Sequence, residues 1–310
     1  MANPLMRTDI ANAVTAGLDD VFWDSAADTP AQYADVFGEE TVDGQYYQAL
    51  PFYGFGQVPE SGEGTAITYD SPGEGYKATV EPDVYKLGCR ITREAYDDER
   101  YAMLKTVPKE LAKSFRYTKN VIAFNILNNG FSDSYVFADS EPLFGDATLY
   151  THPLKNGGTD YNRPASAGTD LTKAAFKTAL IDLKRTLDDR GNYWDIGILS
   201  KGVTLVVPLE LQDKAYELIN SDLDPESANN AKNWIRNIKI SVFVADFLTD
   251  PDAWFVIANK SVHRIKVFNR IALDTDADRE FSTGCLLYSG YERYVPYAES
   301  WRGSWGSPGA

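Results

Sequence analysis

The sequence predicts an α+β protein in which extended segments precede a compact α/β unit. Glycine and aromatic residues recur along residues 38–91, a helical pattern fills residues 92–129, and residues 170–290 alternate between helical and strand patterns. The chain has 310 residues, of which 44% are hydrophobic and 24% charged, so it can bury a sizeable core. No period of 20–50 residues repeats, which argues against a solenoid or a propeller.

The composition excludes several functional classes. Asp and Glu outnumber Lys and Arg by 45 to 30, which gives a net charge of −15 and disfavours a free-standing nucleic-acid binder. We find no run of 18 apolar residues that could span a membrane, and no apolar run near Met1 that could act as a signal peptide. The two cysteines, Cys89 and Cys285, suit a reducing compartment better than a disulfide scaffold.

Residues 1–37 are expected to form an N-terminal arm that docks elsewhere rather than a domain of its own. Ala11, Val14 and Leu18 have helical spacing, which predicts a short helix within the arm.

Residues 38–91 predict an extended β-hairpin. Tyr85, Leu87, Cys89 and Ile91 alternate with polar or small residues, as in a half-buried strand, and residues 66–68 and 76–80 flank a turn at 71–75. The segment holds too few apolar residues for a core of its own, and an isolated hairpin is marginally stable. It therefore needs a partner surface.

Residues 92–169 predict a spine helix followed by a long irregular connection. Thr92 can cap a first piece that runs to about Leu104, and Thr106 can cap a second piece with Pro108 in its first turn. The apolar stripe of the second piece repeats near every 3.6 residues, at Leu111, Phe115, Ile122 and Ile126. Residues 131–169 contain several glycines and are expected to be irregular.

Residues 170–290 predict the α/β domain, and residues 291–310 form a C-terminal segment. Asp170 is expected to cap a helix with Phe176 and Leu180 inward, and Pro208 to open another. Five apolar segments predict strands: residues 203–207, 238–243, 254–258, 262–268 and 285–288.

A search for catalytic and metal-binding patterns finds none. HExxH, CxxC, GxSxG, Walker A and GxGxxG are all absent, and His263 is expected to be an ordinary strand residue. Asp274, Asp276 and Asp278 are similar to the start of a calcium loop, but the sixth and twelfth positions are not glycine and glutamate, so we expect a solvated turn. The sequence predicts no catalytic residue, no cofactor and no metal.

Three local patterns carry a resemblance. The stretch that enters the predicted spine helix is similar to that of Mu-type major head subunits: Ile91-Thr92-Arg93-Glu94, Asp97-Asp98 and Pro108. Leu143-Phe144 with His152-Pro153, and the apolar strand at 203–208 with its following helix, are similar to later segments of that family. In this order the elements resemble the major capsid proteins of tailed bacteriophages. These have the HK97-like fold of N-arm, extended hairpin (E-loop), spine helix with peripheral domain, and axial domain.

The resemblance implies a structural protein rather than an enzyme. It implies self-assembly into hexamers and pentamers of an icosahedral head around double-stranded DNA, with weak non-specific DNA contact and no membrane. A portal, a separate scaffolding protein and a decoration protein are the other expected partners. The expected location is the virion, after assembly in the cytoplasm of a bacterial host. The candidate inter-subunit contacts are Tyr53, Phe55, Tyr69, Tyr76, Lys77, Arg93, Glu94 and Asp98.

Three alternatives stay open at the level of sequence. An encapsulin-like compartment shares the fold. A glycan-acting hydrolase would use the aromatic residues as sugar platforms and two carboxylates for catalysis, and should be a small uniform oligomer. A tail or decoration protein would form rings or tubes, or stay monomeric.

Overall fold

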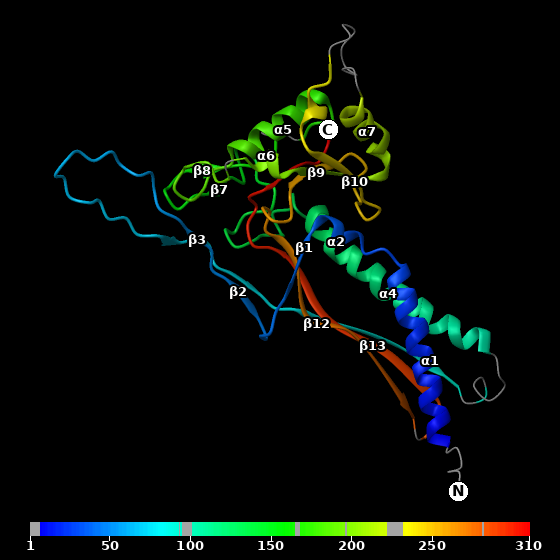
Figure 1. Ribbon diagram of the computed structural model, residues 1–310. Helices are drawn as coiled ribbons and strands as arrows, with labels where there is room; N and C mark the ends of the chain where they lie inside the picture. The colour runs from blue at the N-terminus through cyan, green and yellow to red at the C-terminus, as the bar shows by residue number, and fades with distance from the viewer. Residues whose placement is uncertain are drawn as a thin grey trace.

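The computed structural model describes residues 7–92, 94, 101–164, 168–195, 197–221, 232–280 and 282–310. One lobe is an α/β unit, the other is a long sheet with two helices along it, and a hairpin projects to one side (Figure 1). The long sheet has the strand order β1-β12-β13-β6, and the sheet of the α/β unit has the order β10-β9-β11-β14. The predicted α+β class is confirmed.

The N-terminal segment forms a much longer helix than the short one predicted. Helix α1 spans Arg7–Asp28, and the short helix α2 spans Gln32–Val36. Leu18, Phe22 and Ala26 recur every four residues along α1 and are buried. Their packing partners on the spine helix and the long sheet are Leu111, Ala112, Phe115 and Tyr288. The prediction used only Ala11, Val14 and Leu18. The apolar residues that follow them on the same face extend the helix to Asp28.

The hairpin is longer than predicted, and its turn lies elsewhere. Strands β2 (Tyr47–Ala49) and β5 (Ala78–Val80) pair at its base, and β3 (Phe52–Tyr53) pairs with β4 (Gly73–Glu74) further out. The predicted turn at 71–75 is therefore wrong, because Gly73 and Glu74 lie in a strand. The chain reverses at residues 62–65, where Gly64 has a φ of 79° that suits glycine.

The predicted start of a second helical piece at Thr106 is wrong, because the described helix runs through this residue. Helix α4 spans Tyr101–Asn128 with Pro108 inside it, and much of the predicted first piece lies outside the described residues. Opposite its apolar stripe the long sheet carries Gly290, where a Cβ would come within 2.6 Å of the Phe115 ring. Glycine at this position lets the helix lie close to the sheet. No described helix is long and apolar enough to cross a membrane.

A buried charge joins α4 to the long sheet. Lys119 is 7% exposed, and its Nζ donates a hydrogen bond to Asn269 Oδ1 at 2.9 Å and lies 3.5 Å from Glu292 Oε2. The ammonium also lies 4.6 Å from the centre of the Tyr294 ring. Burial lowers the pKa of Lys119 and raises the pKa of Glu292, so each group depends on the other to stay ionised.

The long sheet contains the largest departure from the predicted strands. It consists of β1 (Gly38–Thr41), β6 (Asp83–Ile91), β12 (Ile265–Arg279) and β13 (Leu286–Ala298). The predicted strands 262–268 and 285–288 are thus too short.

The expected solvated turn at Asp274, Asp276 and Asp278 is also wrong, because these residues lie on one exposed face of β12. The alternate residues Leu273 and Ala277 pack against the core under α1 and α4. The alternation of buried and exposed side chains, and not the acidic composition, determines that this segment is a strand.

The α/β unit is the second lobe. Its sheet consists of β9 (Val203–Val207), β10 (Ile240–Val244), β11 (Trp254–Ala258) and β14 (Ser304–Ser307). Around it lie α5 (Lys173–Arg185), α6 (Ile198–Lys201), α7 (Gln212–Asn220) and the 3-10 turns η1 (Leu209–Leu211) and η2 (Ile235–Asn237). The cap of α5 is Thr172, whose side chain accepts from the Ala175 N–H, and not Asp170 as predicted.

His263 lies in the loop before β12 and not within a strand, which corrects the prediction. Its side chain is buried, Nδ1 accepts from the Ile265 N–H at 3.2 Å, and Nε2 donates to the Val36 carbonyl oxygen at 3.1 Å. These contacts fix a neutral imidazole that ties α2 to the α/β unit. Burial, with Lys260 and Lys266 nearby, lowers the pKa of His263 to about 4.

We expect the free energy of unfolding to fall as the pH drops from about 6.5 to 4 through His263. The unfolded chain binds a proton at this residue in that range while the folded chain does not, so acid favours unfolding, by up to about 3 kcal/mol. Urea denaturation at several pH values should show a steeper loss for the wild-type chain than for His263→Gln, whose amide has no charge to gain. Parallel pH dependences for the two chains would contradict this assignment.

Candidate inter-subunit surface

The outer part of the hairpin exposes apolar side chains without support from its own subunit. Residues 54–72 contain no strand, and Val58 and Tyr69 are 93% and 90% exposed. Four further side chains of the hairpin are large, apolar and exposed: Leu50, Phe52, Phe55 and Ile67. Such a concentration on one projecting segment is typical of a surface that a partner covers.

The predicted aromatic anchors divide into two pairs. Phe55 and Tyr69 are exposed on the outer hairpin. Tyr53 and Tyr76 are half-buried against their own subunit: the Arg190 guanidinium lies 5.4 Å from the Tyr53 ring centre, and Lys155 Nζ lies 3.7 Å from that of Tyr76. The structure therefore brings the second pair to the base of the hairpin.

Arg190 clamps the hairpin to the loop after α5. Its Nη1 lies 2.8 Å from Asp70 Oδ2, and its Nη2 donates to the Ser71 carbonyl oxygen at 2.6 Å. Asp70 also accepts the Gly56 N–H at 2.8 Å, so one carboxylate links both arms of the hairpin to the body. The Gly56 and Ser71 N–H groups and Arg190 lower the pKa of Asp70.

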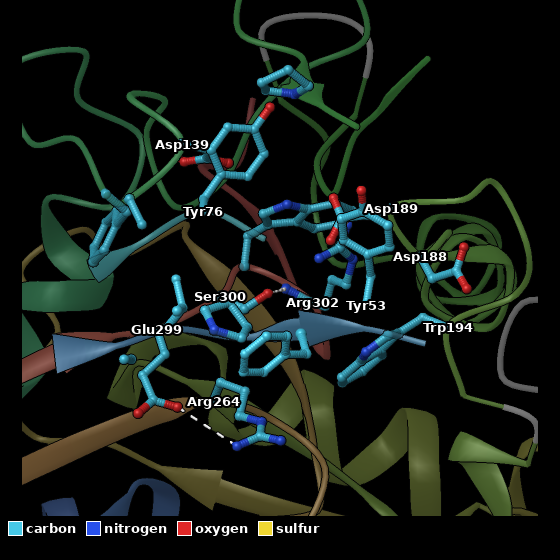
Figure 2. A pocket seen from close by; sticks show the side chains of 18 of the residues that line it. Tyr53, Tyr76, Asp139, Asp188, Asp189, Trp194, Arg264, Glu299, Ser300 and Arg302 are labelled. Carbon is cyan, nitrogen blue, oxygen red and sulfur yellow. Dashed lines mark hydrogen bonds and ion pairs between the residues drawn. The ribbon is translucent and has the colours of Figure 1, made fainter. Parts of the chain in front are cut away.

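A cavity of about 570 Å³ lies at the base of the hairpin (Figure 2). The hairpin residues 47–54 form one wall, and Trp194 and Trp301 form part of another. The charged groups in its lining are Asp139, Asp188, Asp189, Arg264, Glu299 and Arg302.

Several of these charges already have partners within the subunit. Arg302 contacts Asp189 at 3.2 Å, Arg264 contacts Glu299 at 3.7 Å, and Tyr47 donates to Glu299 at 2.9 Å. The Tyr47–Glu299 hydrogen bond holds the base of the hairpin against the body.

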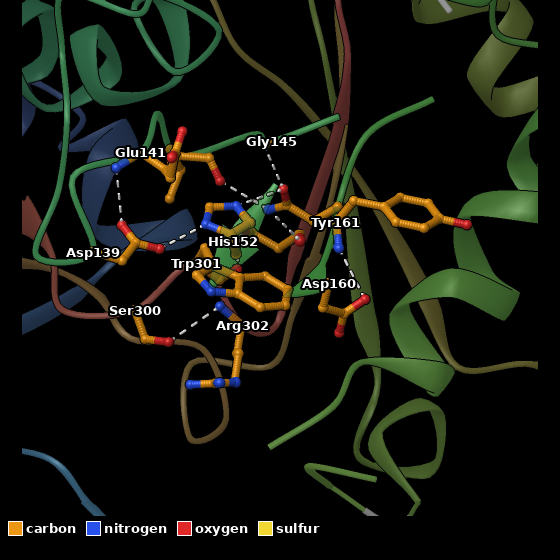
Figure 3. A network of polar contacts seen from close by, with 12 residues as sticks. Asp139, Glu141, Gly145, His152, Asp160, Tyr161, Ser300, Trp301 and Arg302 are labelled. Carbon is orange, nitrogen blue, oxygen red and sulfur yellow. Dashed lines mark hydrogen bonds and ion pairs between the residues drawn. The ribbon is translucent and has the colours of Figure 1, made fainter. Parts of the chain in front are cut away.

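Behind the cavity wall lies a buried network around His152 (Figure 3). His152 is on β7 (His152–Pro153), which pairs with β8 (Thr159–Asp160). Its Nδ1 lies 2.7 Å from Asp139 Oδ2, its Nε2 lies 3.2 Å from Asn162 Oδ1, and its ring stacks on Trp301 at 4.3 Å.

Both nitrogens of this imidazole are thus engaged by groups that have no nucleophilic role. No serine, threonine or cysteine of the described residues is hydrogen-bonded to His152, so the Asp–His pair lacks the third member of a catalytic triad. Within the described part of the chain, no group of His, Cys, Asp and Glu has the arrangement of a metal site.

The structure describes only two of the four charged contact candidates. Lys77 is exposed just before β5, and Glu94 is exposed. Arg93 and Asp98 lie outside the described residues. Sequence reasoning missed Arg190: the Asp188–Gly191 segment looks like a turn, and nothing in it points to Asp70.

The comparisons with known proteins agree with this geometry. Residues 76–305 match the family model described as phage capsid protein. The chain is similar to the capsid of an empty GTA particle, with 12% identity over 88% of each chain and a TM-score of 0.57. No curated protein sequence gives a significant match.

Two further solved structures show the same fold. The mature capsid of bacteriophage PhiM1 is 16% identical, covers 88% of this chain and 85% of its own, and has a TM-score of 0.53. The procapsid of bacteriophage JBD30 is 12% identical over 98% of this chain and 76% of that chain, with a TM-score of 0.52.

These matches support the sequence-based resemblance, and the family match favours a phage capsid protein over the encapsulin-like alternative. They describe a structural protein that self-assembles into a shell and resides in the virion. With a family match over most of its length and the shared fold, the chain belongs to the phage capsid protein family and is a major capsid protein of the HK97-like fold.

Proposed function

We propose that this chain builds its icosahedral shell from hexamers and pentamers that close around double-stranded DNA, and that residues 50–77 reach onto the neighbouring subunit. The observation that carries the proposal is the exposed apolar side chains of the outer hairpin, above all Val58 and Tyr69. A single subunit leaves this surface in water, whereas a ring of copies covers it in every subunit at once.

The energy scale fits this role. Fully burying a large apolar side chain contributes about 1.5–3 kcal/mol. Ordering the hairpin offsets part of that gain, because the free hairpin tip has no main-chain ladder. The clamp at Arg190 holds the hairpin base in place beforehand and so reduces the ordering cost. The remaining gain is repeated at every subunit of a closed shell.

The charged candidates act at the margin of this contact. We propose that its rim includes the charged residues Lys77, Arg93, Glu94 and Asp98. The aromatic contacts that we propose are Tyr53 and Tyr76 at the hairpin base and Phe55 and Tyr69 at the tip. Exposed ion pairs are individually weak but set register and orientation.

The other partners follow from the shell function. A net charge of −15 suits a wall that contacts packaged DNA weakly, because each neutralised phosphate would add salt-dependent affinity. A portal, a separate scaffolding protein and a decoration protein are proposed partners, and assembly is proposed to occur in the cytoplasm of the bacterial host. The engaged state of His152 supports a role without catalysis.

Removing the clamp should loosen the hairpin without unfolding the body. Asp70→Asn keeps the size of the side chain but removes the charge that Arg190 binds. We expect amide hydrogen exchange at the hydrogen-bonded positions of the hairpin, the Gly56 N–H and the paired strands β3 and β4, to accelerate by about tenfold while the rest of the chain is unchanged. The matched control is Glu63→Gln, which removes a charge from the exposed tip; among the described residues, Glu63 forms no ion pair or side-chain hydrogen bond. Equal exchange rates in the two variants would contradict the clamp.

Polar substitutions at the hairpin tip should prevent shells while leaving the subunit soluble. Val58→Asp and Tyr69→Ser remove apolar surface that is already in water, so the thermal midpoint of the isolated subunit should not change. Electron microscopy and light scattering should show closed shells for the wild-type chain and for Tyr69→Phe, which keeps the ring. Normal shells from the double variant Val58→Asp/Tyr69→Ser would refute the docking role of the hairpin.

A further inference from the structure

Two helices of the α/β unit present opposite charges to solvent. We call the exposed face of α5 the basic stripe; it carries Lys177, Ile181, Lys184 and Arg185. The acidic stripe is the exposed face of η1 and α7. It carries Leu209, Glu210, Asp213, Tyr216 and Glu217, with the cation Lys214 among them.

The two stripes lie at opposite ends of the same unit. In the sheet order β10-β9-β11-β14, α7 contacts β9 and β10 at one edge, and α5 contacts β14 at the other. Both helices bury their inner faces in one core, so their exposed faces stay available on either side of it. Figure 1 shows α5 and α7 apart, with the C-terminus between them.

The charges of the stripes are not used within the subunit. Among the described residues, Lys177, Lys184, Glu210, Asp213 and Glu217 form no ion pair. Arg185 lies near the half-buried Asp182, whose pKa is raised mainly by burial. The two faces have opposite net charges, and the like charges that predominate on each face repel one another in a lone subunit, a cost that a complementary neighbour removes.

Each stripe also has apolar side chains among its charges. Ile181 is 37% exposed in the basic stripe, and Leu209 and Tyr216 are 62% and 42% exposed in the acidic stripe. An apolar centre with charged residues around it is the usual composition of a protein–protein interface.

We propose that the basic stripe of one subunit docks against the acidic stripe of the next, head to tail around each ring of the shell. This contact rests on the proposed shell function and names the faces that join neighbouring α/β units. A second copy is the occupant because it supplies both complementary faces in one chain. DNA would bind the basic stripe but be repelled by the acidic stripe, so it explains only half of the pattern.

The test exchanges the charges. The acidic-stripe reversal is Glu210→Lys with Glu217→Lys, and the basic-stripe reversal is Lys177→Glu with Lys184→Glu. Each reversal places like charges across every contact, and we expect it to lower the yield of rings and shells by about tenfold at low salt. The neutral pair Glu210→Gln with Glu217→Gln has the same shape and should lose less. Circular dichroism and thermal melts of the soluble subunits establish that the variants fold.

Two rescues separate this contact from a general loss of assembly. The quadruple variant has both stripes reversed and should recover assembly, because every contact is again between opposite charges. Co-expression of the two reversed chains should also recover it, with the chains alternating, although each fails alone. Even-numbered rings allow strict alternation, so hexamers should be recovered better than pentamers.

The outcomes are distinguishable. If both reversed chains assemble like the wild type, or if neither rescue succeeds, the stripe contact is wrong while the shell function stands. Loss of DNA retention by the basic-stripe reversal with normal shells would assign that stripe to nucleic acid and overturn the proposal. Failure of the wild-type chain to form any ring or shell even when it is co-expressed with the scaffolding protein proposed above would contradict the shell function itself, and the stripe contact with it.

Discussion

Lys119 and Glu292 carry opposite charges into an interior that excludes water, and the elongated lobe is organised around their contact. Lys119 belongs to the spine helix and Glu292 to the long sheet, and the Lys119 ammonium lies 5.6 Å from the Tyr33 ring of the arm. Removing either partner would leave a buried charge without compensation, which is far costlier than losing an exposed ion pair. The contact therefore holds the spine helix, the long sheet and the end of the arm against one another.

Much of the fold was predictable where burial is complete. The strands 203–207 and 254–258 have the predicted bounds, because an uninterrupted apolar run between turn signals has little alternative. The far half of β12 was not predictable, since Asp274, Asp276 and Asp278 are acidic on the exposed face and the covering helices come from distant parts of the sequence. The pattern alone cannot distinguish a half-exposed strand from a solvated turn when the exposed residues favour turns.

The candidate inter-subunit surface was likewise predictable only in part. An exposed aromatic and glycine-rich segment is visible in the sequence, and the resemblance to phage capsid proteins named its position in the fold. The clamp was not visible, because Arg190 and Asp70 are brought together only by the tertiary structure. The separation of the basic and acidic stripes needed the strand order as well, since helical periodicity gives each exposed face but not the sheet edge on which it lies.

The missing strand pairing along residues 54–72 has a consequence for the geometry of the whole shell. Chemically identical chains in a large icosahedral lattice occupy sites with slightly different curvature, and some component must absorb the difference. A hairpin with strand pairing along its whole length would be rigid and would hold every neighbouring subunit at one fixed angle. A tip without main-chain pairs, anchored at its base by side chains, can swing about that anchor while the α/β unit and the elongated lobe keep their shape. The tolerance to unequal surroundings is therefore concentrated in a single segment of each copy.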